Sequence, residues 1–420
     1  MKYFFILGNH PALSLAELVS VLGKDGFIAA GNEASVFEAG YEIGAKEMIR
    51  HLGGTIKIGL TADVLEAKGD PLPKILNSIT RIFPKEKKEG KFKFGFSVYG
   101  NLKLNEKKIG MEVKRLLKEK GISSRWVISK EKQLSSVVVD TNKLVGENGM
   151  EIVIMKIGAN IYVGKTLAVQ PFRELSFRDY GRPSRDDLSG MLPPKLAQAM
   201  INLSGVNMAG QLDINSENDG QDTNRDGTEK NKVKILDPFC GSGTILTEAM
   251  LMGFNNLIGS DISPKAITDT KNNIAWVRNK FNLPETDCEL YEKSATELAQ
   301  FIGPNSIDAI ITEPYLGPQR GSHDAKKTKK ELEDLYSRAI GEFKKVLKEK
   351  GRVIMIWPVF HRGEEWVQLS PKLDGFKIIN PLTGISGLEG VSKGLTNRGT
   401  LIYGREGQKV WREIVVLVKA

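Results

Sequence analysis

The sequence predicts an α/β protein whose C-terminal part forms a mostly parallel sheet covered by helices. Strand-like and helix-like segments alternate from Val233 onward, and the chain closes on two apolar-alternating segments around a glycine-containing turn. This alternation is typical of parallel strands joined by helices, and the closing pair predicts an antiparallel hairpin. With 420 residues the chain is too long for one ordinary core, which indicates two to three domains.

The first 65 residues are expected to form a small α/β module. Residues 3–7 look like a strand, and "HPALSLAELVSVLG" looks like a helix in which Ser14 and Glu17 form a capping box. Short strand-like runs follow near residues 35–38 and 55–60.

Residues 66–170 are expected to form a second α/β module. The pattern predicts a helix over 70–84, a strand of alternating basic and aromatic residues over 91–100, and a basic amphipathic helix over 105–121. Further strands are expected at "RWVIS", "SSVVVD" and "EIVIMKIGANIYVGKTLAVQ".

The positive charge is concentrated in this second module. The whole chain carries a net charge of +9, and residues 81–132 contain 16 Lys and Arg against 6 Asp and Glu, a local charge of +10. Such a segment fits a polyanion-binding domain, and it also fits an ordinary solvated face, so that charge alone leaves both interpretations open.

Residues 171–206 are expected to be a linker that ends in a helix started by Pro193 and Pro194. Residues 207–232 are predicted to be a disordered polar insertion, because the stretch is dominated by Asn, Asp, Gly and Glu and cannot bury enough apolar surface to order itself. The strand–helix alternation of residues 233–420 then predicts a further domain.

Composition excludes several classes of protein. Two cysteines, Cys240 and Cys288, cannot build a disulfide framework or a cysteine zinc site, and four scattered histidines give no metal-ligand cluster. No apolar stretch reaches the roughly 18–20 residues of a membrane span, and the short apolar N-terminus is not a secretory signal. We therefore expect a cytoplasmic protein that uses no metal and contacts no membrane.

The segment "KILDPFCGSGTILTEAMLMG" predicts a strand, a glycine-rich turn and a helix. Gly241 and Gly243 permit a tight turn and let a ligand lie against bare backbone. The turn lacks the lysine of a phosphate-binding P-loop, and Leu246 replaces the third glycine of the dinucleotide fingerprint. Asp261 ends the next strand, where a carboxylate can accept hydrogen bonds from a ribose diol. A nucleoside without phosphates, such as S-adenosylmethionine, suits this combination.

A third motif is "IDAIITEPYLGPQRG". The apolar run Ile307–Ile311 predicts a buried strand that ends in Glu313, Pro314 and Tyr315. Ligands of open parallel sheets bind outside the carboxyl ends of the strands, so these residues are candidates for catalysis. The plainer alternative is that Glu313 caps a backbone amide and Tyr315 is a rim aromatic.

These motifs resemble class I methyltransferases that act on exocyclic amines. Together with "FILGNHPALSLAEL" and "RDYGRPSRDDLSGMLPPKLAQAMINL", they resemble more narrowly the THUMP-containing tRNA guanosine methyltransferases. The resemblance implies a ferredoxin-like module (1–65), a tRNA-binding THUMP module (66–170) and a Rossmann-like class I methyltransferase domain (233–420). It also implies that the 2-amino group of a tRNA guanosine is methylated from S-adenosyl-L-methionine.

These expectations assign roles to particular residues. The Glu313 carboxylate and the Pro314 carbonyl can accept the two N–H bonds of the target amine, and Tyr315 can stack on the base. The residues expected to bind the cofactor are Asp237, Pro238, Phe239, Cys240, Gly241, Gly243, Thr244, Asp261, Ile262, Ser294 and Ala295. The residues expected to contact RNA are Lys91, Lys93, Lys107, Lys108, Arg182, Arg185 and Arg320.

Two positions depart from the family pattern. The family usually has Asp or Asn, two prolines and an aromatic residue at the strand end, where this chain has Glu313-Pro314-Tyr315-Leu316. Ser294 stands where an acid usually faces the adenine amino group. Two alternatives therefore stay open: an inactive methyltransferase scaffold that binds RNA, and an amino-methylase of DNA adenine or ribosomal RNA. The sequence also leaves open a small activating partner protein.

Overall fold

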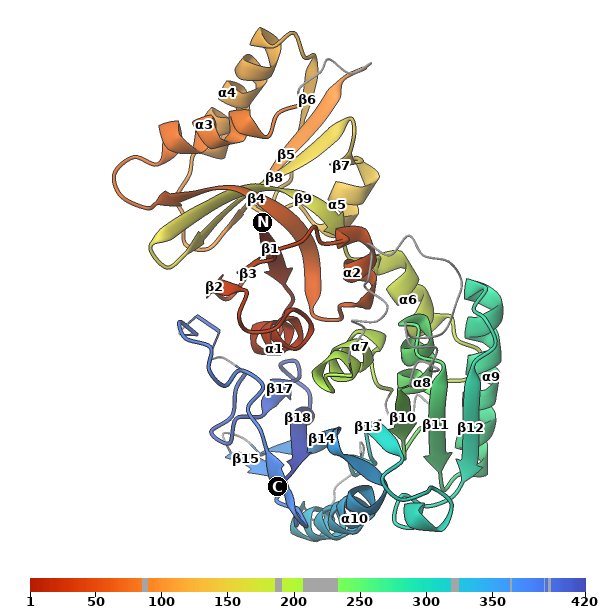
Figure 1. The fold of residues 1–420 in the computed structure, drawn as a ribbon. Coiled ribbons are helices and arrows are strands. Elements are labelled where there is room, and N and C mark those ends of the chain that lie inside the picture. The colour runs from red at the N-terminus through yellow and green to blue at the C-terminus, as the bar shows by residue number, and fades with distance from the viewer. Residues whose placement is uncertain are drawn as a thin grey trace, which may run out of the picture. The chain divides into compact units, whose positions relative to one another are not determined.

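The computed structural model describes residues 1–84, 90–185, 191–206, 233–318, 325–362, 365–388, 390–391 and 394–420. The predicted polar insertion, residues 207–232, lies outside these ranges. The chain forms two compact units (Figure 1). The N-terminal unit contains Met1–Leu15, Leu22–Glu174 and Gly384–Lys393, and the C-terminal unit contains Ala16–Val21, Leu175–Thr383 and Gly394–Ala420.

The N-terminal unit is built on one mixed sheet with the strand order β2-β3-β1-β4-β9-β8-β5-β6, and β7 pairs with β8. Strands β4 and β9 pair antiparallel, so that strands of residues 1–65 and of residues 66–170 belong to a single continuous sheet. The strands are β1 (Lys2–Leu7), β2 (Phe27–Ala30), β3 (Ala34–Glu38), β4 (Thr55–Glu66), β5 (Phe92–Tyr99), β6 (Ser124–Val127), β7 (Val145–Gly146), β8 (Gly149–Ile157) and β9 (Asn160–Val169).

Amphipathic helices cover part of this sheet. Helices α3 and α4 place Ile75, Ile79, Ile109 and Val113 in one core with Phe94 of β5, while the charged residues of both helices face solvent. The helices of residues 1–170 are α1 (Pro11–Leu22), α2 (Ala45–His51), α3 (Leu72–Arg81), α4 (Glu106–Glu119) and α5 (Ser136–Thr141), and Ala16–Val21 of α1 belong to the C-terminal unit.

Two local predictions for this unit are wrong. The run "SSVVVD" forms helix α5 and not a strand, because the Ser135 side chain caps the helix by accepting the Val138 N–H and Val139 packs into a small apolar cluster. Ser14 is not an N-cap, because α1 already begins at Pro11. The Ser14 hydroxyl is buried and donates to the Gly54 carbonyl at 2.7 Å.

The C-terminal unit is built on a sheet with the strand order β12-β11-β10-β13-β14-β18-β16. The first five strands are parallel, and β18 runs antiparallel between β14 and β16. The strands are β10 (Lys234–Asp237), β11 (Asn256–Asp261), β12 (Asp287–Glu292), β13 (Ile307–Thr312), β14 (Leu347–Arg362), β15 (Glu365–Gln368), β16 (Phe376–Ile378), β17 (Leu401–Tyr403) and β18 (Val410–Lys419). The predicted α/β class, with a mostly parallel sheet and a closing antiparallel hairpin, is confirmed.

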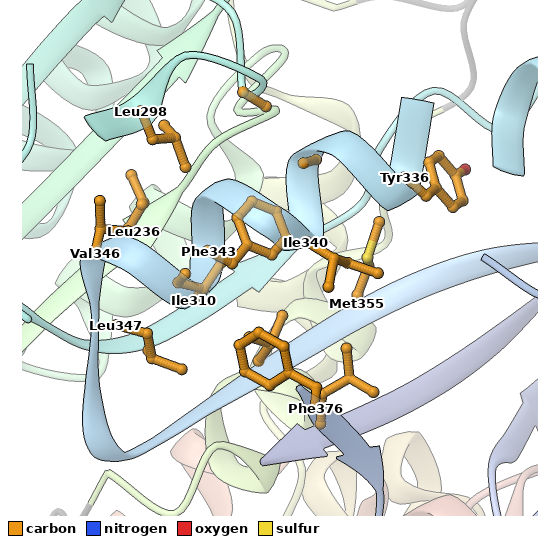
Figure 2. Packing of buried hydrophobic residues seen from close by; sticks show 14 of the residues in the cluster. Leu236, Leu298, Ile310, Tyr336, Ile340, Phe343, Val346, Leu347, Met355 and Phe376 are labelled. Atoms are coloured by element: carbon orange, nitrogen blue, oxygen red, sulfur yellow. The ribbon is translucent and has the colours of Figure 1, made fainter. Parts of the chain in front are cut away.

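Helices follow most of the parallel strands and bury the sheet. Figure 2 shows Tyr336, Ile340 and Phe343 of α10 together with Ile310 of β13 and Met355 of β14 in one cluster of buried hydrophobic residues. The helices are α6 (Phe172–Tyr180), α7 (Pro194–Leu203), α8 (Thr244–Leu251), α9 (Pro264–Phe281) and α10 (Ala325–Val346), with a short 3₁₀ helix at Leu298–Gln300. Among the described residues, no helix is both long and apolar enough to span a membrane.

Candidate active site at the carboxyl ends of the strands

A pocket of about 490 Å³ opens at the carboxyl ends of β10, β11 and β13. Strand order reverses between β10 and β13, and ligands of open α/β sheets bind at such a switch point. A volume of this size suits one small organic ligand. The lining residues are Met191, Leu192, Asp237, Pro238, Phe239, Cys240, Gly241, Ser242, Thr244, Ile245, Asp261, Ile262, Ser263, Lys265, Ala266, Asp269, Ser294, Ala295, Glu313, Pro314, Tyr315, Leu316 and Leu335.

The glycine turn between β10 and α8 lines part of the pocket. Gly241 and Gly243 have φ of +52° and +81°, the left-handed conformation that glycine adopts with little strain. A Cβ on Gly243 would lie 2.9 Å from Thr270 Cγ2, whereas a Cβ on Gly241 would meet no protein atom within 4 Å. Gly243 therefore makes the turn possible, and Gly241 leaves bare backbone facing the pocket.

Asp261 is held rigidly at the end of β11. One carboxylate oxygen accepts the Gly241 N–H at 3.0 Å, and the other accepts the Ser263 N–H at 2.9 Å. Each oxygen keeps a further lone pair, so the carboxylate can still accept two hydrogen bonds from a diol. Asp261 also ties the glycine turn to the neighbouring strand end.

Asp237 is the buried acid of the pocket. Its Oδ1 accepts the Thr312 hydroxyl at 2.8 Å and the Phe239 N–H at 3.3 Å. Burial raises the pKa of Asp237 to about 7, with smaller contributions from the Asp261 and Glu313 charges, although the two hydrogen bonds act in the opposite direction. A cationic ligand group beside Asp237 would favour the ionised form.

The end of β13 presents Glu313, Pro314 and Tyr315 to the same pocket. Arg412 of β18 donates its Nε to Glu313 Oε1 at 2.5 Å, and the buried Tyr336 hydroxyl donates to the Tyr315 carbonyl at 2.7 Å. The Tyr315 ring is 56% exposed, which leaves a face on which a planar base could stack. The strand end is thus fixed from two sides, while its aromatic ring stays accessible.

Two further predicted residues lie at the edge of the pocket. Ile262 is 76% exposed beside Asp261, and it can cover one face of a planar ligand. The Ser294 hydroxyl interacts with the Thr296 hydroxyl at 2.8 Å and accepts the Thr296 N–H at 3.2 Å, so this serine first organises its own turn.

The Cys240 side chain gives no sign of nucleophilic chemistry. The side chain is buried, and burial, followed by the Asp237 charge, raises the pKa of the thiol far above its usual range. Within the described ranges of the chain, no group of three or more His, Cys, Asp or Glu side chains could hold a metal ion.

The pocket brings together the residues that the sequence predicted for catalysis and cofactor binding, except Gly243, which supports the turn from outside the pocket wall. Lys91, Lys107 and Lys108 are exposed on the N-terminal unit, and Lys93 is half-buried. These positions are compatible with the predicted RNA contacts of the four lysines, which stay a prediction.

The arginines of the predicted linker behave differently. Arg182 is 7% exposed and donates to Thr244 Oγ1 at 2.6 Å and to the Arg178 carbonyl at 3.0 Å. In this conformation its guanidinium supports the glycine turn and is not presented to RNA. Arg185 is half-buried and stacks over the Tyr180 ring at 5.5 Å. Arg320 lies outside the described residues.

Several pocket residues were not predicted from the sequence. Ser263 caps α9, and Lys265, Ala266 and Asp269 lie on its first turns; their closeness to Asp261 could have indicated them. Leu335 of α10 and the Glu313 partner Arg412 come from distant parts of the chain, and no local pattern marks them.

Most residues that line the pocket, all except Met191 and Leu192, lie within a region that matches a known family. The family model of the RMKL-like methyltransferase domain, UPF0020, matches residues 227–369. A solved structure of TrmN from Thermus thermophilus aligns over 100% of both chains with a TM-score of 0.52 and 17% sequence identity, which reflects a shared fold.

Curated relatives carry a more specific name. A Methanothermobacter thermautotrophicus protein named tRNA (guanine(10)-N2)-dimethyltransferase is 31% identical over 40% of this chain, but the match spans only 39% of that relative. A Pyrococcus abyssi protein of the same name is 23% identical over 85% of this chain and 88% of its own length. Residues 227–369 are therefore similar to the RMKL-like methyltransferase domain of the UPF0020 family, and the chain is similar to proteins named tRNA (guanine(10)-N2)-dimethyltransferase.

Proposed function

We propose that the protein is an S-adenosylmethionine-dependent tRNA methyltransferase that methylates the 2-amino group of a guanosine. One observation carries the proposal: a single pocket of a methyltransferase domain contains the glycine turn, the ribose-type acceptor Asp261 and the Glu313-Pro314-Tyr315 strand end. The names of the relatives indicate tRNA as the substrate and guanine 10 as the position. The inactive-scaffold and DNA or ribosomal RNA alternatives are not favoured by these names.

The pocket suits S-adenosylmethionine. Asp261, with one free lone pair on each oriented oxygen, would accept the two ribose hydroxyls. Asp237 would face the positively charged methionine end, and Ile262 would cover the adenine. When bound, the cofactor supplies a methyl group already activated on a sulfonium sulfur, so that the remaining task of the protein is positioning.

The strand end would position the acceptor. An exocyclic amine is a poor nucleophile because its lone pair is delocalised into the ring. Two acceptors, the Glu313 carboxylate and the Pro314 carbonyl, would take the two N–H bonds, localise the lone pair and offset the positive charge that develops on nitrogen. Tyr315 would stack on the base, which a stem guanosine reaches only after flipping out of the helix.

The reaction balances without further reactants. The amine nitrogen would form the new N–C bond with its lone pair, and the bound cofactor would supply the methyl group and keep the electrons of the bond that is broken. The nitrogen then loses one proton to water. Asp237, Cys240 and the Tyr336 hydroxyl need not exchange a proton with the substrate.

Nucleoside mass spectrometry tests the proposed activity. An unmodified tRNA transcript with guanosine at position 10 is incubated with the protein and methyl-deuterated cofactor, then digested to nucleosides. We expect labelled N2-methylguanosine or N2,N2-dimethylguanosine, which is lost when guanosine 10 is replaced by adenosine. Label on adenosine, or on no nucleoside, would contradict the proposal.

Calorimetry with S-adenosylmethionine tests the cofactor separately. The wild-type protein should bind, and Asp261→Ala should bind about 1–3 kcal/mol more weakly, since the ribose hydroxyls and two backbone N–H groups lose their acceptor. Equal affinity of the two proteins would remove Asp261 from the cofactor site. A silent titration on folded wild-type protein would favour the binding-only scaffold. The cytoplasmic location expected from the cysteines stays a prediction.

A further inference from the structure

Arg412 contacts the proposed catalytic carboxylate from a distant strand. It lies on β18, 99 residues from Glu313, and its Nε donates to Glu313 Oε1 at 2.5 Å. The pair is mostly buried, with 14% of the Arg412 side chain and 12% of the Glu313 side chain exposed. Arg412 also donates Nη2 to the Met191 carbonyl at 3.4 Å. No residue near Arg412 in the sequence marks it as part of the site.

The neighbouring ion pair shows what a purely structural pair looks like here. Glu413 points to the opposite side of the strand, is 0% exposed, and is held by Arg398 and by the Thr400 hydroxyl. Arg398 occupies both Glu413 oxygens and additionally donates to the Leu369 carbonyl at 2.7 Å. The Arg398 guanidinium and both Glu413 oxygens are thus hydrogen-bonded within the protein, and neither residue lines the pocket.

The Glu313–Arg412 pair differs in both respects. Glu313 lines the pocket, whereas Arg412 does not. Arg412 takes only one carboxylate oxygen, and Oε2 has no hydrogen-bond partner among the described residues. The arginine therefore restrains the carboxylate while leaving one oxygen for a ligand.

The negative charge of the pocket gives a second reason why Arg412 pairs with Glu313. Asp237, Asp261 and Glu313 all line one pocket, and three carboxylates close together repel one another. Burial acts to lower the pKa of Arg412, but Glu313 and Tyr403 raise it above its usual value, so that the guanidinium stays charged. The cation offsets the negative charge at the strand end without entering the pocket.

We propose that Arg412 is a positioning residue for methyl transfer: it fixes the Glu313 carboxylate so that the free oxygen accepts an N–H of the target amine. A glutamate is longer and more flexible than an aspartate, so it needs a second contact to hold a single orientation. The proposal rests on the proposed function and adds a residue that acts only through Glu313.

Single-turnover methyl transfer at saturating cofactor and tRNA tests the proposal. We expect Arg412→Gln to slow the step by about 10–100-fold, in the range of a lost transition-state contact. The dissociation constants of cofactor and tRNA should change less than about 3-fold, because Arg412 touches neither ligand. Arg412→Lys keeps the charge without the fixed Nε geometry and should give an intermediate rate.

A double-variant comparison separates positioning from general destabilisation. In a Glu313→Gln background the ion pair is already absent, so adding Arg412→Gln should slow the reaction by less than about 3-fold. Arg398→Gln is the matched control, since it breaks the ion pair of Glu413, which is the residue next to Arg412 on β18. It should lower the melting temperature and leave the single-turnover rate of the folded protein unchanged.

The possible failures are distinguishable. A wild-type protein that methylates no tRNA contradicts the proposed function, and the role of Arg412 falls with it. If the wild type is active and Arg412→Gln matches its rate, only the role of Arg412 is wrong. The role of Arg412 is also wrong if the rate losses of Glu313→Gln and Arg412→Gln multiply in the double variant. The same holds if Arg398→Gln slows methyl transfer as much as Arg412→Gln does. Should Arg412→Gln not fold, the same comparisons are made with Arg412→Lys, and a wild-type rate there counts against the proposal.

Discussion

At the scale of single residues, Glu313 and Tyr315 occupy the same strand end with different surroundings. Glu313 is mostly buried against Arg412, while the Tyr315 ring is 56% exposed. An acceptor that meets developing charge contributes mainly in the transition state, whereas an exposed ring that stacks on a base contributes to binding. The two side chains should therefore affect different kinetic constants.

We predict that Glu313→Gln lowers the rate of methyl transfer by roughly 10–1000-fold and leaves tRNA and cofactor affinity nearly unchanged. Tyr315→Ala should instead raise the Michaelis constant for tRNA, with Tyr315→Phe close to wild type because the ring is retained. Steady-state kinetics with all three variants provide the measurement. A wild-type rate in Glu313→Gln would make the strand end structural only.

Asp237 leads to a pH prediction. Its pKa is raised by burial to about 7 in the folded protein, compared with about 4 in an unfolded chain. The folded state then binds more protons than the unfolded state between these values, so stability from this group falls as pH rises from about 4 to 7. Above about pH 7 Asp237 is ionised in both states, and the free-energy cost of burying its charge lowers the stability of the folded state in full.

We predict that Asp237→Asn, which cannot ionise, gains stability relative to wild type as pH rises. The difference in melting temperature between the two proteins should be small at pH 4.5 and larger at pH 8, corresponding to at most about 4 kcal/mol. Thermal unfolding of both proteins without cofactor measures it. A difference that does not vary with pH would show that Asp237 does not titrate in this range.

At the scale of elements, the two glycines of the turn between β10 and α8 have different roles. Gly243 has φ of +81° and a Cβ there would press on Thr270, a short, buried, β-branched side chain. Gly241 also has positive φ, but a Cβ there meets no protein atom and faces the pocket. The first glycine therefore serves the ligand, and the second serves the fold.

We predict that Gly243→Ala lowers stability by more than the roughly 1–2 kcal/mol of a left-handed alanine, since the Thr270 contact adds to it. Gly241→Ala should cost only that conformational amount but weaken cofactor binding more strongly. Melting temperatures and calorimetric titrations of both variants give the comparison. Equal effects of the two substitutions on both measurements would contradict this division.

Local pattern predicted the elements of the C-terminal unit well, because most of its parallel strands contain a short buried apolar run; β12, with the sequence DCELYE, is the exception. The β10–turn–α8 segment, the Asp261 strand end and the Glu313 strand end were all located from the sequence. Prediction failed where contacts from elsewhere decide the structure. "SSVVVD" has β-branched residues typical of strands, yet the Ser135 cap and the burial of Val139 favour a helix. Arg182, which the sequence suggested for RNA, is buried against Thr244, and Arg412 reaches Glu313 across 99 residues.

At the scale of the whole molecule, positive charge is gathered in the N-terminal unit. Helix α4 turns Ile109, Val113 and Leu117 inward, and its lysines, Lys107 and Lys108 among them, face solvent. An exposed basic helix beside a sheet fits contact with phosphates, which would give binding that is strong, indifferent to sequence and sensitive to salt. Sequence specificity would then come from the pocket in the C-terminal unit.

We predict that tRNA binding by the whole protein weakens steeply between about 50 and 200 mM salt. Replacing Lys107, Lys108 and Lys114 by glutamine should make the plot of log K against log salt less steep by about 2–3, because each lost phosphate contact contributes about 0.9 to the slope. Lys344, Lys372 and Lys377 of the C-terminal unit are exposed as well, and Lys344 lies on the last turn of α10, which leads into the end of the sheet opposite the pocket. Their replacement by glutamine removes the same charge and should leave the slope unchanged. Filter binding across a salt series measures all three proteins. Affinity that does not vary with salt, or an equal change of slope in the two triple variants, would show that the α4 face does not hold the tRNA backbone.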